Sequence, residues 1–397
     1  MTKIREFMKN RRDSEVDEEY EEKLRKHRNG KIIRYIILIA IVAIVCAVAI
    51  IMNYTKTYET YEVTKNIMTG DTTKYKYYSY NGYFLKYSND GLSYINGKDV
   101  IWNQAFEMKR PIIDICEDYV AIADQKSTSI YILNEKGIVG KVKTTYPIVN
   151  IEVAGQGVVA AVTEEEDKNH IEILDKNGKV LAMGQTVLSG DGCPVDMSLS
   201  EDGTKLVVSY LYVNNGVTQT RVVFYNYSEV GKNEVDRIVG GFNQYKTTIV
   251  PKVEFVTNNV AVAFGDDMFT IYSMKQKPSI VIEEKHLKPV ESILYNDEYI
   301  GFIYEREQPT KPYNMKIYNI EGELVYDGDL DINYKKVKLD GSNIIVYNDD
   351  TILVQTVKGD IKYKQTIDMT IEEIMGIDGG YEYILITKES IDEIALK

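Results

Sequence analysis

The stretch "RPIIDICEDYVAIAD", Arg110 to Asp124, indicates the fold because the chain repeats its pattern. Close copies are "YPIVNIEVAGQGVVAAV" from Tyr146 and "KPVESILYNDEYIGFIY" from Lys288. Looser copies are "CPVDMSLSEDGTKLVVSY" from Cys193 and "VPKVEFVTNNVAVAF" from Val250. Each copy contains two short runs that alternate with a period of two and are separated by turn residues. This pattern predicts a pair of β-strands in every copy.

Two further runs follow each pair, so that the repeating unit has four strands. After Arg110–Asp124 these are "SIYIL" from Ser129 and "IVGKVKT" from Ile138. The second strand of each unit is predicted to start at Tyr83, Tyr119, Gly157, Lys205, Asn259, Tyr299, Asn343 and Tyr381. The intervals between these starts, about 36 to about 54 residues, bracket the usual length of a four-stranded propeller blade.

Proline and glycine mark fixed places in the unit. Five of the eight prolines stand just before or at the first strand, namely Pro111, Pro147, Pro194, Pro251 and Pro289. Proline has no N–H to donate, so it suits the start of a strand, and we expect each one to begin a new blade near the central axis. The turn before the fourth strand ends in Gly137, Gly178, Gly322 and Gly359. Glycine supplies the positive φ that a tight turn requires.

Eight copies predict an all-β fold, a β-propeller of eight four-stranded blades, with seven blades as the alternative. The last copy, from Ile371, supplies only three strands before the chain ends. The segment "TYETYEVTKNI", Thr57 to Ile67, precedes the first full unit. We expect it to be the missing fourth strand, which would close the ring and leave no open edge at the ends of the chain.

The N-terminal region carries a long apolar run. No charged residue occurs from Ile36 to Met52, so the sequence predicts a transmembrane helix over residues 32–52. Basic residues crowd its N-terminal side, which predicts a cytoplasmic tail over residues 1–31 and an extracytoplasmic domain over residues 53–397. A cleaved signal peptide, with a site at Ala47–Ala49, and a lipoprotein modified at Cys46 are the alternatives. The long tail argues against the first, and Val45, where a small residue is required, argues against the second.

The charge balance limits the class of partner. The chain of 397 residues has 47 basic and 60 acidic residues and a net charge of −13. Residues 35–397 alone hold 36 basic and 52 acidic residues, a net charge of about −16. Phosphate contacts need basic surface, so we expect no nucleic-acid partner. Membrane lipid is expected to contact only the N-terminal helix, and cations or basic partners suit the acidic domain.

Few residues suggest catalysis. The three histidines are His27, His170 and His286, and the last two are expected on the solvated surface beside acidic residues. Three cysteines without metal-ligand spacing argue against a disulfide framework or a zinc site. The acidic stretch 327–333 resembles a calcium loop but has Ile332 at its sixth position and Lys338 at its twelfth, where glycine and glutamate are required. We therefore predict no catalytic residue and no cofactor.

The first strands carry a set of polar residues at comparable places. These are Asp114, Asn150, Asp196 and Glu254, with Glu291 and Glu372 as further candidates. Alternation could direct them towards a central channel, where oxygen atoms could hold a hard cation or a cationic ligand. The simpler interpretation is that a hydrated channel needs polar walls.

Three insertions fall between second and third strands, at residues 164–169, 214–219 and 305–312. In a propeller these loops share one face with the links between blades. Longer loops on one face of a repeat fold are often its binding face, so we expect a protein partner there.

In layout the sequence resembles propellers of the WD40 and quinoprotein type, and "SLSEDGTKLVVSY" from Ser198 resembles their turn between first and second strands. Trp102 is the only tryptophan, so their Trp-containing motifs are missing. With its anchor, the chain resembles a bacterial domain-of-unknown-function family of single-pass, membrane-anchored propellers, a resemblance that implies fold and topology but no activity. The hypothesis is a non-enzymatic protein-interaction or ligand-binding platform in the bacterial cell envelope. The alternatives are a ligand or cation sensor acting through a membrane partner, and a carboxylate-dependent enzyme on envelope glycans.

Overall fold

The computed structural model describes residues 55–397 except 71, 309–310 and 378–379, and before them residues 25, 29, 34–46 and 48. The chain forms two compact units, Met1–Thr57 and Tyr58–Lys397. In the first unit, residues 34–46 and 48 are helical with exposed apolar side chains. None of the helices in the described ranges is both long and apolar enough to cross a membrane. The other residues of the expected span 32–52 lie outside the described residues.

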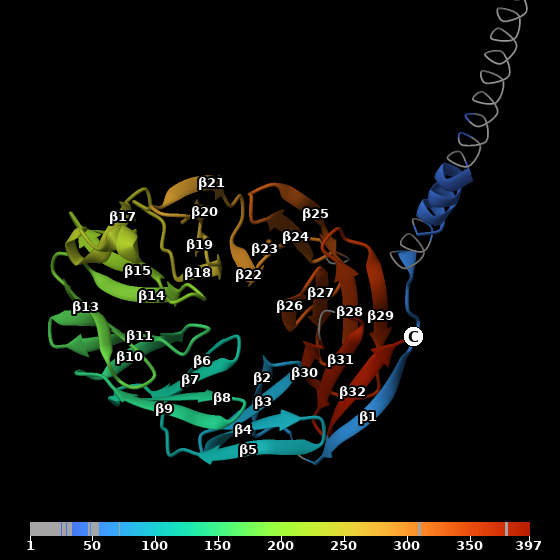
Figure 1. Ribbon diagram of the computed structural model, residues 1–397, viewed down its shortest axis with the longest axis horizontal. Coiled ribbons are helices and arrows are strands. Elements are labelled where there is room, and N and C mark those ends of the chain that lie inside the picture. The colour runs from blue at the N-terminus through green and yellow to red at the C-terminus, as the bar shows by residue number, and fades with distance from the viewer. Residues whose placement is uncertain are drawn as a thin grey trace, which may run out of the picture. The chain divides into compact units, whose positions relative to one another are not determined.

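The second unit consists of eight antiparallel sheets of four strands each, arranged in a ring (Figure 1). Blades 1 to 4 contain β2 (Lys76–Tyr80), β3 (Tyr83–Ser88), β4 (Gly91–Asn96), β5 (Asp99–Ala105); β6 (Pro111–Cys116), β7 (Tyr119–Asp124), β8 (Ser129–Asn134), β9 (Gly137–Lys143); β10 (Ile148–Val153), β11 (Val159–Glu165), β12 (Lys168–Leu174), β13 (Val180–Val187); β14 (Cys193–Leu199), β15 (Lys205–Asn214), β16 (Val217–Asn226), β17 (Ile238–Phe242). Blades 5 to 8 contain β18 (Lys252–Thr257), β19 (Val260–Phe264), β20 (Met268–Ser273), β21 (Ser279–Lys285); β22 (Val290–Tyr295), β23 (Tyr299–Glu305), β24 (Tyr313–Asn319), β25 (Leu324–Leu330); β26 (Lys336–Asp340), β27 (Asn343–Tyr347), β28 (Thr351–Thr356), β29 (Ile361–Thr366); and β30 (Ile371–Gly376), β31 (Glu382–Thr387), β32 (Ser390–Leu396), β1 (Tyr61–Thr69). Two 3₁₀ turns, η1 (Glu229–Gly231) and η2 (Val235–Arg237), precede β17.

The predicted eight-bladed, all-β propeller is therefore confirmed. All eight second strands begin within two residues of their predicted starts. Each of the five prolines stands at or next to the start of the first strand of a blade. The turn glycines adopt φ values of 85° to 95°, and Gly178 donates its N–H to the carbonyl of Asp175 at 2.9 Å. The repeat thus encodes strand starts and turns directly.

The last blade combines both ends of the domain, as expected. β1 is its outermost strand and pairs with β32 from Tyr61 opposite Leu396 to Thr69 opposite Ser390. The N–H of Lys397 donates to the carbonyl of Thr60 at 2.8 Å. Figure 1 shows the C-terminus beside β1. The ring is closed by a strand from the start of the domain.

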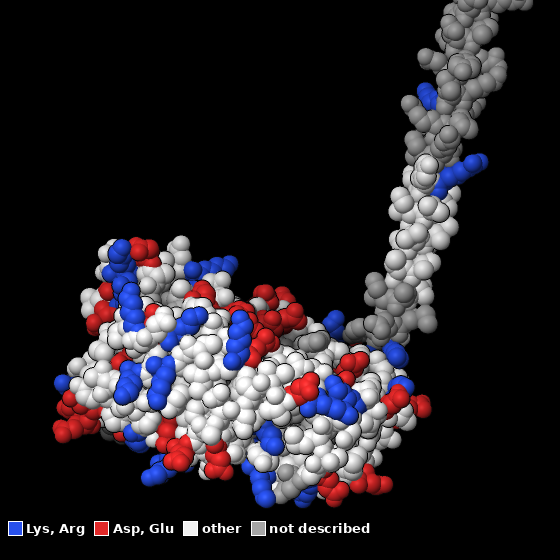
Figure 2. Space-filling view, turned by 60° about the horizontal axis from the view of Figure 1, so that its bottom comes forward, with Lys and Arg blue, Asp and Glu red and all other residues white. Residues whose placement is uncertain are grey.

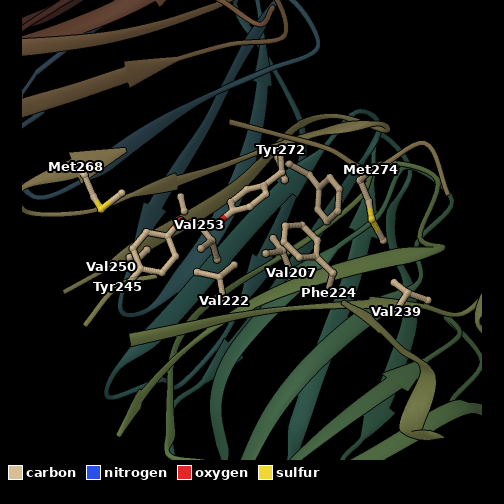
Figure 3. Close-up of a cluster of buried hydrophobic side chains, with 13 residues drawn as sticks. Val207, Val222, Phe224, Val239, Tyr245, Val250, Val253, Met268, Tyr272 and Met274 are labelled. Atoms are coloured by element: carbon tan, nitrogen blue, oxygen red, sulfur yellow. Dashed lines mark hydrogen bonds between the residues drawn. The ribbon is translucent and has the colours of Figure 1, made fainter. Parts of the chain in front are cut away.

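Apolar residues of the second and third strands fill the space between neighbouring blades. One such cluster joins blades 4 and 5 through Phe224 of β16 and Tyr272 of β20, whose ring centroids lie 5.0 Å apart (Figure 3). Tyr245 is fully buried in this cluster, and its hydroxyl lies 2.5 Å from that of Tyr272 and donates to Thr270 at 2.8 Å. Burial of this apolar surface, together with the hydrogen bonds of Tyr245, holds blade 4 against blade 5.

Two of the three predicted insertions are not loops. Residues 164–169 and 214–219 lie mainly in strands, joined by two-residue turns at 166–167 and 215–216. Asn215 and Gly216 both have positive φ, which suits a tight hairpin, so the extra residues lengthen β15 and β16 to ten residues each. Of the three predicted insertions, the one between β23 and β24 is an irregular loop, and residues 309–310 within it lie outside the described residues.

Candidate functional site

The four predicted channel residues lie on the first strands of four successive blades, β6, β10, β14 and β18. Asp114 accepts a hydrogen bond from the backbone N–H of Val153 at 2.6 Å, and Asp196 accepts one from Val253 at 2.9 Å. Each donor belongs to the first strand of the next blade. These two aspartates therefore join neighbouring blades next to the axis.

A lysine that the sequence interpretation did not single out lies among these acids. The Nζ of Lys252 is 2.7 Å from Oε2 of Glu254 and 3.6 Å from Oδ2 of Asp196. The hydroxyl of Tyr295 donates to Glu254 at 3.1 Å. Glu152, on the same strand as Asn150, interacts electrostatically with the acids on both sides. We call Asp114, Glu152, Asp196, Lys252, Glu254 and Tyr295 the first-strand cluster.

The remaining predicted residues do not share these contacts. The side-chain oxygen of Asn150 accepts from the N–H of Ile151 at 3.0 Å. Glu291 is exposed on β22, and Glu372 is half-buried on β30. The prediction that all these residues line a channel for a cation stays a prediction.

Burial and crowding of negative charge raise the pKa values of Asp114, Glu152 and Asp196. Burial, with a contribution from Glu254, raises the pKa of Asp114 to about 6 against the opposing hydrogen bond from Val153. Burial and the charge of Asp114 raise the pKa of Glu152 well above its usual range. Burial disfavours the charge on Lys252, but Glu254 and Asp196 outweigh it, so that the pKa of this lysine is raised.

The geometry makes the cluster a charge network with its own cation. Lys252 neutralises part of an excess of carboxylates, and its side chain remains 30% exposed. Across the residues that the structure describes, no three His, Cys, Asp or Glu side chains come close enough together to hold a metal ion. Contacts of the cluster join the first strands of blades 2 and 3, of blades 4 and 5, and of blades 5 and 6. With its pKa raised to about 6, Asp114 is the group expected to exchange a proton near neutral pH.

We expect Asp114→Asn to raise the free energy of unfolding by about 1–2 kcal/mol at pH 8, because it removes a charge that burial penalises. The folded pKa of about 6 lies above the ordinary value of 3.8, so the penalty is absent below pH 3.8 and fully present above pH 6. Urea unfolding from pH 4 to pH 8 should show the two proteins converging at acid pH. The exposed Asp331→Asn serves as the control, and an equal gain at pH 4 and pH 8 would contradict this origin.

The second candidate region is the face that carries the links between blades and the turns between second and third strands, which we call the link face. Large apolar side chains are exposed there: Leu287 is 94% exposed on the link from β21 to β22, and Val213 is 72% exposed at the end of β15. Val217 of β16 and Leu188 after β13 are 47% and 38% exposed. A cavity of about 340 Å³ opens on the same face between blades 5 and 6.

The acidic stretch that resembles a calcium loop belongs to this region, and two of its aspartates form ion pairs with basic side chains. Asp327 and Asp329 lie within β25 itself and not in a link. Asp329 pairs with Arg306 and, at 2.7 Å, with Lys311. Lys316 lies 3.5 Å from Asp327. These ion pairs tie β25 to the residues around the irregular loop.

The expectation of two solvated surface histidines is wrong. His170 is 5% exposed, stacks on Tyr146 with ring centroids 4.5 Å apart, and lies 3.0 Å from Oε2 of Glu165. His286 is half-buried, with Nδ1 2.8 Å from the hydroxyl of Tyr304. Both imidazoles fill apolar space beside aromatic rings, which charged neighbours in the sequence do not reveal.

Charge on the surface is mixed. Figure 2 shows Lys and Arg interspersed with Asp and Glu on the visible face, without one extended basic area. The three cysteines are free, and Cys193 is exposed.

These observations define the class: an eight-bladed propeller closed by its N-terminal strand, with a charge network on its first strands and apolar side chains exposed on its link face. The chain belongs to the family of unknown function DUF5711, whose profile matches residues 54–396. No curated protein matches it in sequence.

Two solved structures illustrate the likeness of fold. BamB from Moraxella catarrhalis has 11% sequence identity and a TM-score of 0.50, with 86% of this chain and 99% of that chain covered. Sqt1 from Saccharomyces cerevisiae has 9% identity, a TM-score of 0.50 and the same coverage. At such identities the likeness concerns the fold alone.

Proposed function

We propose that this chain is a non-enzymatic binding platform whose link face holds a protein partner. The observation that carries the proposal is the exposure of Leu188, Val213, Val217 and Leu287 on the link face. Exposed apolar side chains gain little for the fold, whereas a partner that covers them removes them from water. The ten-residue strands β15 and β16, the longest in the described chain, present Val213 and Val217 near their hairpin turn.

The rigidity of the blades supports this role. The link from β21 to β22 and the β15–β16 hairpin both extend from sheets that are packed on either side. A scaffold of this kind holds loop residues in one geometry, so that less conformational entropy is lost when a partner binds. The other two functions, sensing of a ligand or cation and hydrolysis of envelope glycans, would instead act through the first-strand cluster. Asp114→Asn separates the two possibilities, because a platform keeps its partner in that variant.

The proposal places the propeller outside the cytoplasmic membrane of a bacterial cell envelope, anchored by residues 32–52. Support comes from the uncharged run Ile36–Met52, the basic residues before it, and the exposed apolar side chains of the helical residues 36–45. Protease added to intact spheroplasts is expected to degrade the propeller and to leave a tag at the N-terminus protected. Protection of the propeller until the membrane is lysed would contradict this orientation.

The partner is expected to depend on the exposed apolar residues of the link face. In wild-type cells we expect a stoichiometric protein partner to cross-link to the tagged chain and to be identified by mass spectrometry. The double variant Val213→Ser with Leu287→Ser should abolish this cross-link. Both side chains are exposed, so the double variant should unfold at the same temperature as the wild type. Val235→Ser is the matched control, because Val235 is 81% exposed but lies between third and fourth strands, on the opposite face. Capture that survives the double variant, or capture of this chain alone, counts against the platform.

A further inference from the structure

The cavity on the link face lies between the outer strand of blade 5 and two strands of blade 6. Its walls include Lys285 of β21, Lys288 of the following link, Tyr304 of β23 and Lys316 of β24. Its volume of about 340 Å³ falls within the range of small-molecule sites, roughly 300–1,000 Å³. The cavity therefore has room for a ligand of modest size.

Positive charge gathers around this cavity although the chain as a whole is acidic. Lys285, Lys288, Arg306 and Lys316 line it, against one acid, Glu284. The carboxylate of Glu284 accepts a hydrogen bond from Tyr318 at 2.7 Å, which directs part of its charge away from solvent. Arg306 and Lys316 are each paired with an aspartate outside this lining, so the excess of positive charge at the cavity comes from Lys285 and Lys288.

Two of these four bases are also held in place. Arg306 pairs with Asp329, and Lys316 lies 3.5 Å from Asp327. The remaining two, Lys285 and Lys288, lie in exposed positions, and the Nζ of Lys288 donates to the backbone carbonyl of Glu305 at 3.3 Å. The cavity thus combines fixed cations with two adaptable ones at its rim.

The other components of the wall are apolar or neutral. Tyr304 is 7% exposed, and its hydroxyl is engaged by His286, whose pKa is lowered by burial so that the ring is neutral at pH 7. Leu287, 94% exposed, lies between the two rim lysines in sequence. Aromatic and aliphatic surface next to cations suits a molecule with an apolar body and a negative end.

We infer that the cavity between blades 5 and 6 binds a small anionic ligand with an apolar body, either a carboxylate or a phosphate ester. This inference rests on the binding role proposed for the link face and gives it a ligand chemistry. The anionic group contacts the basic side chains, and the apolar body covers Tyr304 and Leu287.

Isothermal titration calorimetry on the full chain in non-ionic detergent tests the inference with three probes: 4-phenylbutyrate, 4-phenylbutylamine and phenyl phosphate. The first and third are expected to bind and the amine is not, because the amine has the same apolar body as the carboxylate but the opposite charge. Lys285→Gln with Lys288→Gln should weaken binding roughly tenfold, and so should a rise in salt from 50 mM to 500 mM. Lys232→Gln with Lys277→Gln, two exposed lysines between third and fourth strands on the opposite face, should change nothing.

The three probes show which anionic group the ligand carries and which results contradict the inference. Tighter binding of 4-phenylbutyrate identifies a carboxylate ligand, and tighter binding of phenyl phosphate identifies a phosphate ester. Equal binding of the amine, unaltered binding to the Lys285/Lys288 variant, or no binding of either anion overturns the inference. If the anions bind but no protein partner is captured by cross-linking, the anion site stands and the platform proposal fails. If a protein partner is captured but neither anion binds, the platform stands and the anion site fails.

Discussion

A chain that begins at Thr72 instead of Thr55 is expected to lose roughly 5 kcal/mol of unfolding free energy, because the last blade then lacks its outer strand. β1 contributes half-buried Tyr61, Ile67 and Met68, and just before it Tyr58 packs on Tyr381 with ring centroids 4.7 Å apart. Its loss also exposes the edge of β32, which favours association between molecules.

This effect can be measured by urea unfolding and by size-exclusion chromatography of both chains. A synthetic peptide of residues 58–70 added to the shortened chain should restore most of the lost stability, because it can occupy the vacant place beside β32. A peptide with the same residues in scrambled order is the control. If the shortened chain is as stable as the longer one and remains monomeric, β1 does not close the ring in solution.

Lys252→Met is expected to cost about 2–3 kcal/mol at pH 8, because Glu254 and Asp196 keep their half-buried places but lose their cation. The estimate lies below that for a fully buried pair because the lysine side chain is 30% exposed and partly screened by solvent. The cost should fall as the pH is lowered towards 5. Burial raises the pKa of Asp196, so its protonation then removes part of the uncompensated charge. The pKa values of Asp114 and Glu152 are raised as well, so their protonation removes further negative charge beside Glu254.

Two variants test this origin in chemical denaturation. Adding Glu254→Gln to Lys252→Met should recover part of the loss, because one unpaired charge disappears while the amide can still accept from Tyr295. Lys277→Met, at an exposed lysine of blade 5, should cost less than about 1 kcal/mol. A loss that is the same at pH 5 and pH 8 would exclude the charge network as its cause.

The sequence predicted the ring because repetition averages over local ambiguity. One proline or one glycine is weak evidence, but Pro111 and Gly137 each recur at the same place in several units, where a strand start and a positive φ impose the same demand. The closing strand could be predicted by counting strands. The last repeat unit has only three, and the segment Thr57 to Ile67 before the first unit supplies the fourth. The insertions were misread because added length can extend a hairpin as easily as a loop.

The polar cluster was predicted only in part, and the reason is local register. Asp114 and Glu254 both lie three residues after a proline, and this offset led to Asn150 in blade 3. Irregular pairing between Ile148 and Asn150 makes that offset unreliable. Alternation would have led from Asn150 to Glu152 and from Glu254 to Lys252, since residues two apart in a strand share a side.

The pairing of β1 with β32 also determines when the last blade can be completed during synthesis. β1 is among the first parts of the domain to leave the ribosome, and its partner, Ser390–Leu396, is the last. At about 5–20 residues per second, β1 remains without its partner for on the order of half a minute. Each unfinished chain therefore carries an open strand edge until β32 emerges, and a chain that stops before β32 keeps that edge permanently.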